Sequence, residues 1–295
     1  MITMRIKGGL GNQLFQYAAA YSLSRRLDQL FQFNPSFTST MTARGYKLPE
    51  LMVDVDLAVQ DDQLPWKVKV IKNAYINKVF RLMNSPKHKC GNYLYWLETR
   101  DEWQPDFFSI DSQNLYVDGY FQSEEYFKQY RDDLLRQFRP NYEAENLFLK
   151  VLDQIQHHNS VAVHVRRSDF KKDNNPFHYL LDENYYRKAV CFIRSKVQTP
   201  VFFWFSDDME WVKTHIGDAQ DFIFVSIKTS HGDIDDMMLM KNCNHIITAN
   251  STFSWWAAWL NEHEDAIRVV PEKPYGMAGM IPDMWVKLKV DSNPD

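Results

Sequence analysis

The sequence is poor in the features that would set it apart from ordinary globular proteins. Its 295 residues include three cysteines, Cys90, Cys191 and Cys243, an odd number with no CxxC pair. This argues against a disulfide framework and a zinc site, and it fits a reducing cytoplasm. No apolar run approaches the roughly 18 residues of a membrane span, and the N-terminus lacks a signal-peptide core. We therefore expect a cytoplasmic protein, soluble or peripherally bound to the inner membrane.

An excess of positive charge and the common phosphate-binding glycine patterns are also missing. Thirty-four basic residues face 38 acidic ones, so the charge balance does not indicate nucleic acid as a partner. The segment GGLGNQ at 8–13 lacks the GxGxxG spacing and the GK[ST] ending, which disfavours a dinucleotide-binding or kinase-type loop. Its glycines permit close approach to a ligand, and Asn12 and Gln13 are candidates to bind a sugar or phosphate across an interdomain cleft. The alternative is a tight turn before a helix.

The second half of the chain shows the clearest order. From Ser160 onward apolar strands alternate with helical patterns. The strands lie near 161–166, 201–205, 222–226, 246–249 and 267–270, and the helices near 183–196, 208–215, 235–243 and 253–261. This alternation predicts a parallel, doubly wound α/β sheet, that is, a Rossmann-like domain.

The first half is harder to interpret. A predicted strand at 2–7 is followed by the glycine-rich segment and a helix. The periodicity of 31–115 is mixed, so most helices and strands of this region cannot be assigned from the sequence. A further helix is predicted from Ser123, as its N-cap, to just before Pro140. The polar stretch beyond it suggests a boundary between two domains, 1–150 and 151–295.

One stretch, 67–89, is rich in basic residues. It contains seven of them and no acidic residue: Lys67, Lys69, Lys72, Lys78, Arg81, Lys87 and Lys89. Apolar residues recur between them at helical spacing, which predicts a basic amphipathic helix. A solvated helix face is the favoured interpretation. The second is a surface that contacts an anionic membrane or binds a lipid-diphosphate-linked molecule.

Polar residues close the predicted strands of the second half, where ligands bind in a doubly wound sheet. Alternation along the first of these strands puts His164 and Arg166 on one side and Arg167 on the other, so the two arginines should differ in role. A guanidinium at this place grips a diphosphate through two parallel hydrogen bonds, and we assign this to Arg166. For Arg167 the alternative is a structural salt bridge with Asp169.

Carboxylates and hydroxyls follow the neighbouring strands. Asp207 closes the second strand and Asp236 lies early in a later helix, and each has a plain alternative as a capping or N-terminal charge. We expect Asp236 to accept hydrogen bonds from a ribose or from the N1 and N2 edge of guanine. The metal-binding DxD pattern occurs at 233–235 but also at 54–56, as such short patterns do by chance, and no metal is assigned.

The turn NSTFSWW leads into a helix. Its residues Asn250, Ser251 and Thr252 offer polar side chains and free backbone N–H groups where the helix dipole attracts phosphate. Simple capping of the helix by a hydroxyl is the alternative, and the two roles are compatible. The tryptophans at 255, 256 and 259 are interpreted as core.

Five motifs, spread in order over nearly the whole chain, resemble the alpha-1,2-fucosyltransferase family. They are GGLGNQLFQYAAAYSL near the N-terminus, GYFQSEEYF at 119–127, HVRRSDF at 164–170, FSDD at 205–208 and ANSTFSWWAAWL at 249–260. The resemblance implies a GT-B architecture: two Rossmann-like domains, acceptor-side at 1–150 and donor-binding at 151–295, with the active site between them. It also implies inverting transfer of L-fucose from GDP-beta-L-fucose to the 2-hydroxyl of a terminal galactose, without a cofactor or required metal. A role in surface polysaccharide or O-antigen synthesis, on a lipid-linked acceptor, would follow.

The resemblance also suggests roles for particular residues. Arg166 resembles the arginine that binds the donor diphosphate, with Ser251 and Thr252 assisting. The other expected donor contacts are His164 and Asp236 on the nucleotide side, Asp207 and Asn250 at the strand ends, and Gly9, Asn12 and Gln13 from the N-terminal loop. The sequence position of Asp169, near the proposed phosphate arginine, rather than the resemblance, makes it the candidate catalytic base, with a salt bridge as the equal alternative. His178, Asp173 and Glu183 are the other candidates, on or beside a loop, 170–182, that we expect to close over the sugar.

Two other functions compete with this interpretation. Another GT-B transferase that uses a different nucleotide sugar would share the diphosphate chemistry. A non-catalytic carbohydrate-binding protein would fit the 15% aromatic content, but it would not need an arginine beside a phosphate-binding turn.

Overall fold

The computed structural model describes residues 1–35, 45–53, 59–100, 102–167, 179–272 and 279–290. The chain forms two compact units, Met1–Tyr142 and Glu143–Asp295. The boundary lies earlier than the expected residue 150, because helix α6 (Asn146–Gln156) packs on β6 and α9 and so belongs to the second unit.

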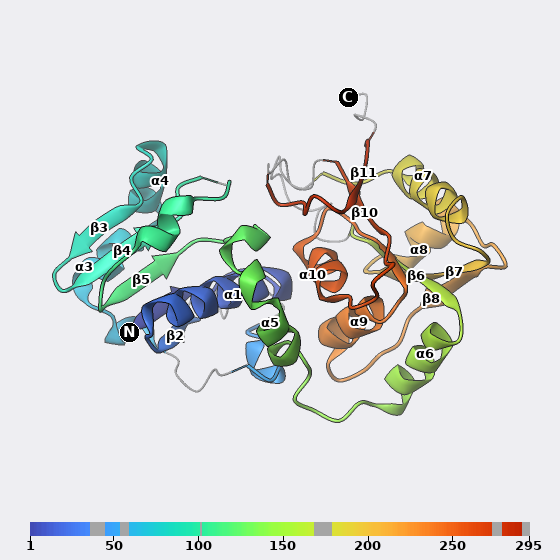
Figure 1. Cartoon of the computed structure of the whole chain (residues 1–295), viewed down its shortest axis with the longest axis horizontal. Helices are drawn as coiled ribbons and strands as arrows, with labels where there is room; N and C mark the ends of the chain where they lie inside the picture. The colour runs from blue at the N-terminus through green and yellow to red at the C-terminus, as the bar shows by residue number, and fades with distance from the viewer. Residues whose placement is uncertain (36–44, 54–58, 101, 168–178, 273–278, 291–295) are drawn as a thin grey trace. The chain divides into compact units, whose positions relative to one another are not determined.

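The first unit is built on a five-stranded sheet in the order β2-β1-β5-β4-β3 (Figure 1). Of these strands only the edge pair β3 and β4 is antiparallel. The strands are β1 (Ile2–Arg5), β2 (Phe31–Asn34), β3 (Lys87–Cys90), β4 (Tyr93–Leu97) and β5 (Leu115–Asp118). Helix α1 (Leu10–Leu27) covers one face, where the ring of Tyr17 stacks on Phe33.

The other face of this sheet is covered by two short helices, α3 (Trp66–Ile71) and α4 (Ala74–Leu82). The prediction of one basic helix over 67–89 is therefore wrong. Asn73 interrupts it, because its side chain accepts a hydrogen bond from the backbone N–H of Tyr75 and so starts α4 as a new helix. The last residues of the stretch belong to strand β3.

The predicted helix from Ser123 is likewise broken. The Ser123 hydroxyl does cap the segment by accepting from a backbone N–H, but two 3-10 turns, Glu124–Tyr126 and Lys128–Tyr130, precede α5 (Arg131–Gln137). Phe127 between the turns has φ −151°, outside the helical region. Its buried ring packs against Phe15 of α1, so tertiary packing overrides the helical pattern.

The second unit contains a six-stranded, fully parallel sheet in the order β11-β10-β9-β6-β7-β8. The strands are β6 (Asn159–Val165), β7 (Pro200–Ser206), β8 (Phe222–Val225), β9 (His245–Ile247), β10 (Arg268–Pro271) and β11 (Val286–Leu288). The helices α7 (Glu183–Arg194), α8 (Met209–Trp211), which continues into a π-helical turn (Val212–Ile216), α9 (Gly232–Lys241) and α10 (Thr252–Leu260) alternate with them. The predicted doubly wound sheet is thus confirmed. Strand β11 was not predicted, because its three residues carry no distinctive pattern.

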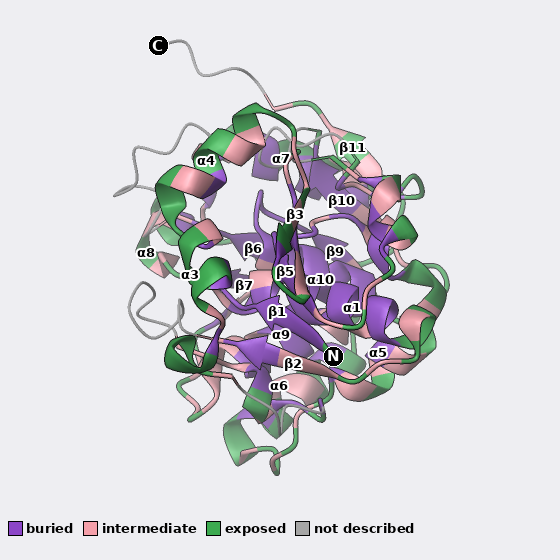
Figure 2. Ribbon diagram, turned by 90° about the vertical axis from the view of Figure 1, so that its left-hand side faces the viewer, coloured by how far each residue is buried: buried purple, intermediate pink, exposed green. Residues whose placement is uncertain are grey.

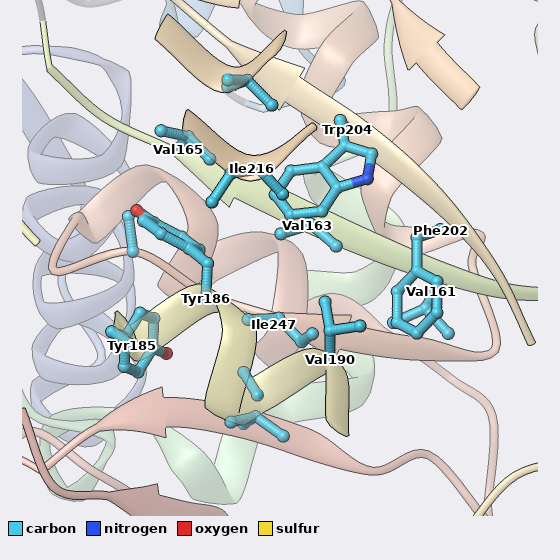
Figure 3. Packing of buried hydrophobic residues seen from close by; sticks show 14 of the residues in the cluster. Val161, Val163, Val165, Tyr185, Tyr186, Val190, Phe202, Trp204, Ile216 and Ile247 are labelled. Atoms are coloured by element: carbon cyan, nitrogen blue, oxygen red, sulfur yellow. The ribbon is translucent and has the colours of Figure 1, made fainter. Parts of the chain in front are cut away.

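The core of this unit fixes the central strand β6. Figure 3 shows Val161, Val163 and Val165 of β6 packed with Tyr186 of α7 and Trp204 of β7, all in one buried cluster. Because alternate residues of β6 are anchored in this way, the polar residues that follow Val165 emerge at a fixed place at the carboxyl end of the sheet. The predicted core tryptophans of α10 are also buried.

Among the helices that the structure describes, none has the length and apolar character needed to cross a bilayer.

Candidate functional site

The residues predicted from strand ends gather at the carboxyl ends of three adjacent strands. Strand β6 lies between β7 and β9, with Val165 paired to Ser206 and Val163 paired to Ile247. Arg166 and Asp207, the next residues of β6 and β7, therefore leave the sheet side by side, and Thr248, the next residue of β9, lies level with His164. Ligands of open α/β sheets bind at this edge.

Arg166 and Asp207 are partners across the first two strand ends. The guanidinium Nη1 of Arg166 lies 3.4 Å from Oδ2 of Asp207, and Arg166 is only 8% exposed. The other carboxylate oxygen, Oδ1, accepts a hydrogen bond of 2.9 Å from the backbone N–H of Arg167. Asp207 thus orients the Arg166 guanidinium and holds the backbone at Arg167.

Arg167 has different surroundings from Arg166. Its guanidinium lies 3.8 Å from the ring centroid of Trp211, and Nη1 donates a 3.2 Å hydrogen bond to the carbonyl oxygen of Leu181. These contacts hold α7 and α8 against the end of β6, which is a packing role. Asp169, the expected partner of Arg167 and candidate base, lies outside the described residues, as do Asp173 and His178. Glu183 is the first residue of α7.

Helix α10 begins beside these strand ends. The ring of His164 is buried 5.4 Å from that of Phe253 in the first turn of the helix. Ser251 is the N-cap, its hydroxyl accepting from the N–H of Phe253, so the capping alternative holds for this residue. Both Ser251 and Thr252 are buried at the helix N-terminus, where backbone N–H groups favour anions.

Asn250 is completely buried just before this cap. Its side-chain N–H donates to the carbonyl oxygen of Tyr179 at 2.7 Å. Within the described parts of the chain, its Oδ1 and the hydroxyl of the neighbouring Thr248 have no hydrogen-bond partner. Buried polar atoms rarely remain unsatisfied in folded proteins, and those that do often belong to functional sites. Thr248 was not predicted, although its position at a strand end was a usable signal.

Asp236 lies in the first half of α9, a helix that packs on α10. Burial, reinforced by the carboxylates of Asp233 and Asp235, raises the pKa of Asp236 from 3.8 to about 7. Because these surroundings disfavour the ionised carboxylate of Asp236, a ligand that donates hydrogen bonds to this carboxylate would stabilise it. No group of three or more His, Cys, Asp or Glu side chains is placed to hold a metal in the described residues.

The predicted residues of the N-terminal loop lie in the first unit. Gly9 is the N-cap of α1, preceded by Gly8 with φ +82°, where a Cβ atom would come within 2.5 Å of the Asn12 amide nitrogen. The Asn12 side-chain oxygen accepts from Gln122 at 2.8 Å. Gln13 is fully buried and its amide bonds to the backbone of Gly8 and residues 45 and 47. These three residues therefore shape the loop, and their contact with a donor remains a prediction.

A buried polar cluster beneath α3 was missed by the sequence analysis. Asp118, at the end of β5, is 0% exposed and bonds to Arg5 at 2.7 Å, to Lys7 at 2.8 Å and to the hydroxyl of Tyr95 at 2.7 Å. Burial by itself would raise the pKa of Asp118, but the Lys7 and Arg5 cations outweigh it and hold the pKa far below its ordinary value. The signal was again the polar residue that ends a strand.

Glu98, at the end of β4, is a second buried carboxylate that the sequence analysis missed. It accepts the backbone N–H groups of Tyr120 at 2.6 Å and of Phe121 at 3.1 Å. Phe121 has a φ of +55°, a strained value for a residue other than glycine. Glu98 thus holds the segment from which Gln122 reaches Asn12.

Comparison with known proteins shows that the chain is similar to glycosyltransferases. The sequence model of glycosyl transferase family 11 matches residues 1–277. Two Escherichia coli proteins, an alpha-1,2-colitosyltransferase and the O-antigen biosynthesis glycosyltransferase WbnK, are 28% and 29% identical, over 98% and 96% of this chain and 99% of each relative. The galactoside alpha-(1,2)-fucosyltransferase 2 of Rattus norvegicus is 26% identical over 100% of this chain and 78% of its own length.

Solved structures with similar folds include fucosyltransferases. The alpha-1,6-fucosyltransferase NodZ, soaked with GDP-fucose, superposes with a TM-score of 0.53 at 16% identity, covering 88% of this chain and 91% of NodZ. At this identity the likeness concerns the fold. Together with the two α/β units, whose sheets are parallel except for the edge pair β3 and β4, it establishes the GT-B class of α/β architecture.

Proposed function

Because the chain belongs to glycosyl transferase family 11, we propose that it transfers L-fucose from GDP-beta-L-fucose to the 2-hydroxyl of a terminal galactose. The observation that carries this proposal is the match along almost the whole chain to relatives named for alpha-1,2 transfer of fucose or colitose. One of them takes part in O-antigen synthesis by name, so we propose a surface glycan, lipid-linked during its assembly, as the acceptor. Three unpaired cysteines are compatible with activity in the cytoplasm.

The proposed reaction is a single displacement with inversion. The acceptor oxygen forms a bond to C1 of fucose as the C1–O bond to the diphosphate breaks, and the hydroxyl proton passes to a base. A beta-linked donor then gives the alpha linkage for which the relatives are named. We keep Asp169, three residues after the diphosphate arginine in sequence, as the proposed base.

Arg166 is proposed to stabilise the departing GDP. Its guanidinium is nearly buried and is oriented by Asp207, so it keeps a fixed position while negative charge grows on the diphosphate. The N-terminus of α10, with Ser251 and Thr252, would supply N–H and O–H donors to the same group. The buried hydroxyl of Thr248 is a further candidate hydrogen-bond donor, whereas the buried Oδ1 of Asn250 can only accept and would suit an N–H or O–H group of the donor molecule.

A second donor is suggested by the colitosyltransferase relative. Colitose is the 3-deoxy form of fucose, so the two donors differ by one hydroxyl. Initial rates with GDP-fucose, GDP-colitose and UDP-galactose at matched concentrations decide between them. The proposal expects GDP-fucose to have the highest kcat/KM; preference for GDP-colitose would assign the alternative, and a lack of turnover with either GDP-sugar would reject both.

Removal of metal ions is expected to leave activity unchanged within about twofold. The proposal assigns to Arg166, a permanent cation, the charge stabilisation that a divalent ion supplies in other transferases. Rates of GDP release with excess EDTA, compared with rates in added Mg²⁺ or Mn²⁺, test this. A loss of activity in EDTA that Mn²⁺ restores would show that a metal ion is required.

Asp236 is proposed to accept the N1–H and N2–H donors of guanine in its ionised form. GDP affinity should therefore rise as the pH increases through about 7, the folded-state pKa. Asp236→Asn should bind GDP roughly 10- to 100-fold more weakly at pH 8, in line with loss of hydrogen bonds to a charged group, and should lack this pH dependence. Titration calorimetry with GDP and with IDP, which lacks the N2 amine, measures both effects. Equal affinities of wild type and variant would remove Asp236 from the site.

The ligand-free protein provides the control for this titration. Because the pKa of Asp236 is raised on folding, ionising it costs stability, and the cost grows from about pH 4 and is complete above about pH 7. Asp236→Asn should then melt at a higher temperature than wild type at pH 8, with a ceiling of about 4 kcal/mol, and the difference should shrink toward pH 4.

A further inference from the structure

The outward side of α3 and α4 carries large apolar side chains that no part of the described chain covers. Six of them are between 47% and 83% exposed: Trp66, Val70, Tyr75, Val79, Leu82 and Met83. On α4, Tyr75, Val79 and Leu82 are spaced by four and three residues and so form one stripe. Figure 2 shows α3 and α4 largely in the colour of exposed residues. Large apolar side chains exposed together on neighbouring helices usually mark an interaction surface.

Basic side chains accompany this apolar patch. Four basic residues of the two helices are exposed or half-buried: Lys67, Lys69, Lys78 and Arg81. The residues from Trp66 to Leu97 include no Asp or Glu, although the whole chain has a formal charge of −4. The local charge is therefore strongly positive against a weakly negative background. We call the six apolar and these four basic residues together the outer face.

Helices α3 and α4 pack on the sheet through other residues, so the outer face is not a core-facing side that has detached. Val68 is fully buried against Tyr95 and Tyr116 of the sheet. At the end of α3, Arg5 donates to the carbonyl oxygen of Lys72 at 3.3 Å. On α4, Asn77 donates to the hydroxyl of Tyr95 at 3.4 Å.

Each helix thus has its own inward residues in addition to the outer face. In α4 these include Phe80, whose ring stacks on His88 at 3.7 Å. The apolar stripe of Tyr75, Val79 and Leu82 is therefore an addition to the core contacts of the helix. A helix on a solvated surface would carry polar residues there.

We propose that the outer face binds an anionic membrane surface. The apolar side chains would enter the headgroup region, where Trp and Tyr are favoured, while the lysines and Arg81 pair with lipid phosphates. Positive charge and apolar bulk on the same short helices fit this occupant, since each attracts a different part of the bilayer interface. The favoured sequence interpretation, a solvated face, does not account for the exposed Trp66, Tyr75 and Leu82. The proposal does not depend on the identity of the sugar donor or acceptor.

Vesicle flotation with the full chain tests the proposal. Wild type should float with phosphatidylcholine vesicles that contain phosphatidylglycerol, at low salt, and should stay in solution with phosphatidylcholine alone. Lys78→Gln with Arg81→Gln should weaken binding about 25-fold, because each basic residue contributes about fivefold near an anionic surface. Tyr75→Ser with Leu82→Ser leaves the charge unchanged and should weaken binding at least about tenfold.

A matched control lies on α6 in the second unit. Leu147 and Lys150 are also exposed, and Leu147→Ser with Lys150→Gln removes one apolar side chain and one charge elsewhere. This variant should bind vesicles like wild type, and thermal melting should show that all variants are folded. Wild type that stays in solution with anionic vesicles would overturn the proposal. Undiminished binding by the Tyr75→Ser, Leu82→Ser variant, or equal binding to both kinds of vesicle, would also overturn it.

Discussion

Replacing Arg166 with alanine is expected to lower kcat/KM for sugar transfer by about 100- to 1,000-fold, the loss seen when a preorganised donor to a developing anion is removed. Arg166 is 8% exposed, so the lost guanidinium is not replaced by bulk water at the same place. The change also leaves the Asp207 carboxylate, 3.4 Å away, without this cation. Initial rates of GDP release at varied GDP-fucose give the effect.

Two further variants separate charge, geometry and folding. Arg166→Lys keeps the charge but loses the pair of parallel hydrogen bonds, and should fall between wild type and alanine. Arg167→Ala is the matched control, because Arg167 stacks on Trp211. It should lower stability by about 0.5–2 kcal/mol while kcat/KM changes by a few-fold at most. An Arg166→Ala protein that melts normally and keeps activity within tenfold of wild type would contradict the assigned role.

The largest effect on stability is expected from Asp118→Asn, a loss of about 3–5 kcal/mol. The variant leaves the buried cations of Arg5 and Lys7 without their shared anion. Because the folded-state pKa of Asp118 is depressed, its contribution is fully present above the ordinary pKa of 3.8 and declines only as the pH falls below that value. Urea unfolding at pH 7 measures the loss.

Glu125→Gln provides the comparison for Asp118. Glu125 forms an exposed ion pair with Lys128 within one turn of chain, and such pairs contribute about 0–1 kcal/mol. A loss for Asp118→Asn no larger than that for Glu125→Gln would show that the buried cluster does not hold the first unit together.

The second unit was predictable because its signals are local. Strands such as VFFWF at 201–205 are continuous apolar runs, bounded by helices with their own periodicity. The first unit depends instead on pairings between distant residues. Its inner strand β1 carries Arg5, whose partner Asp118 lies on the central strand β5 more than a hundred positions away, and neither charge looks like core in isolation. For the same reason 31–115 resisted assignment.

The candidate site was predicted in outline for a similar reason. Strand order places Arg166 beside Asp207 once the sheet is recognised, because parallel strands end at one edge. Contacts made by bends and loops were not predictable. The stacking of Arg167 on Trp211 and the hydrogen bond from Gln122 to Asn12 depend on the tertiary packing of helices and turns that are distant in sequence. The assignment of Asp169 as base remains a prediction outside the described residues.

The central claim is transfer to a galactose 2-hydroxyl, and one assay tests it most directly. GDP release from GDP-fucose is measured with lactose and with lactose whose galactose lacks the 2-hydroxyl, and the product is analysed for its mass and linkage. We predict GDP release and an alpha-1,2-fucosylated product with lactose, and neither with the 2-deoxy acceptor. Equal GDP release with both acceptors, or fucose attached at another hydroxyl, would contradict the account.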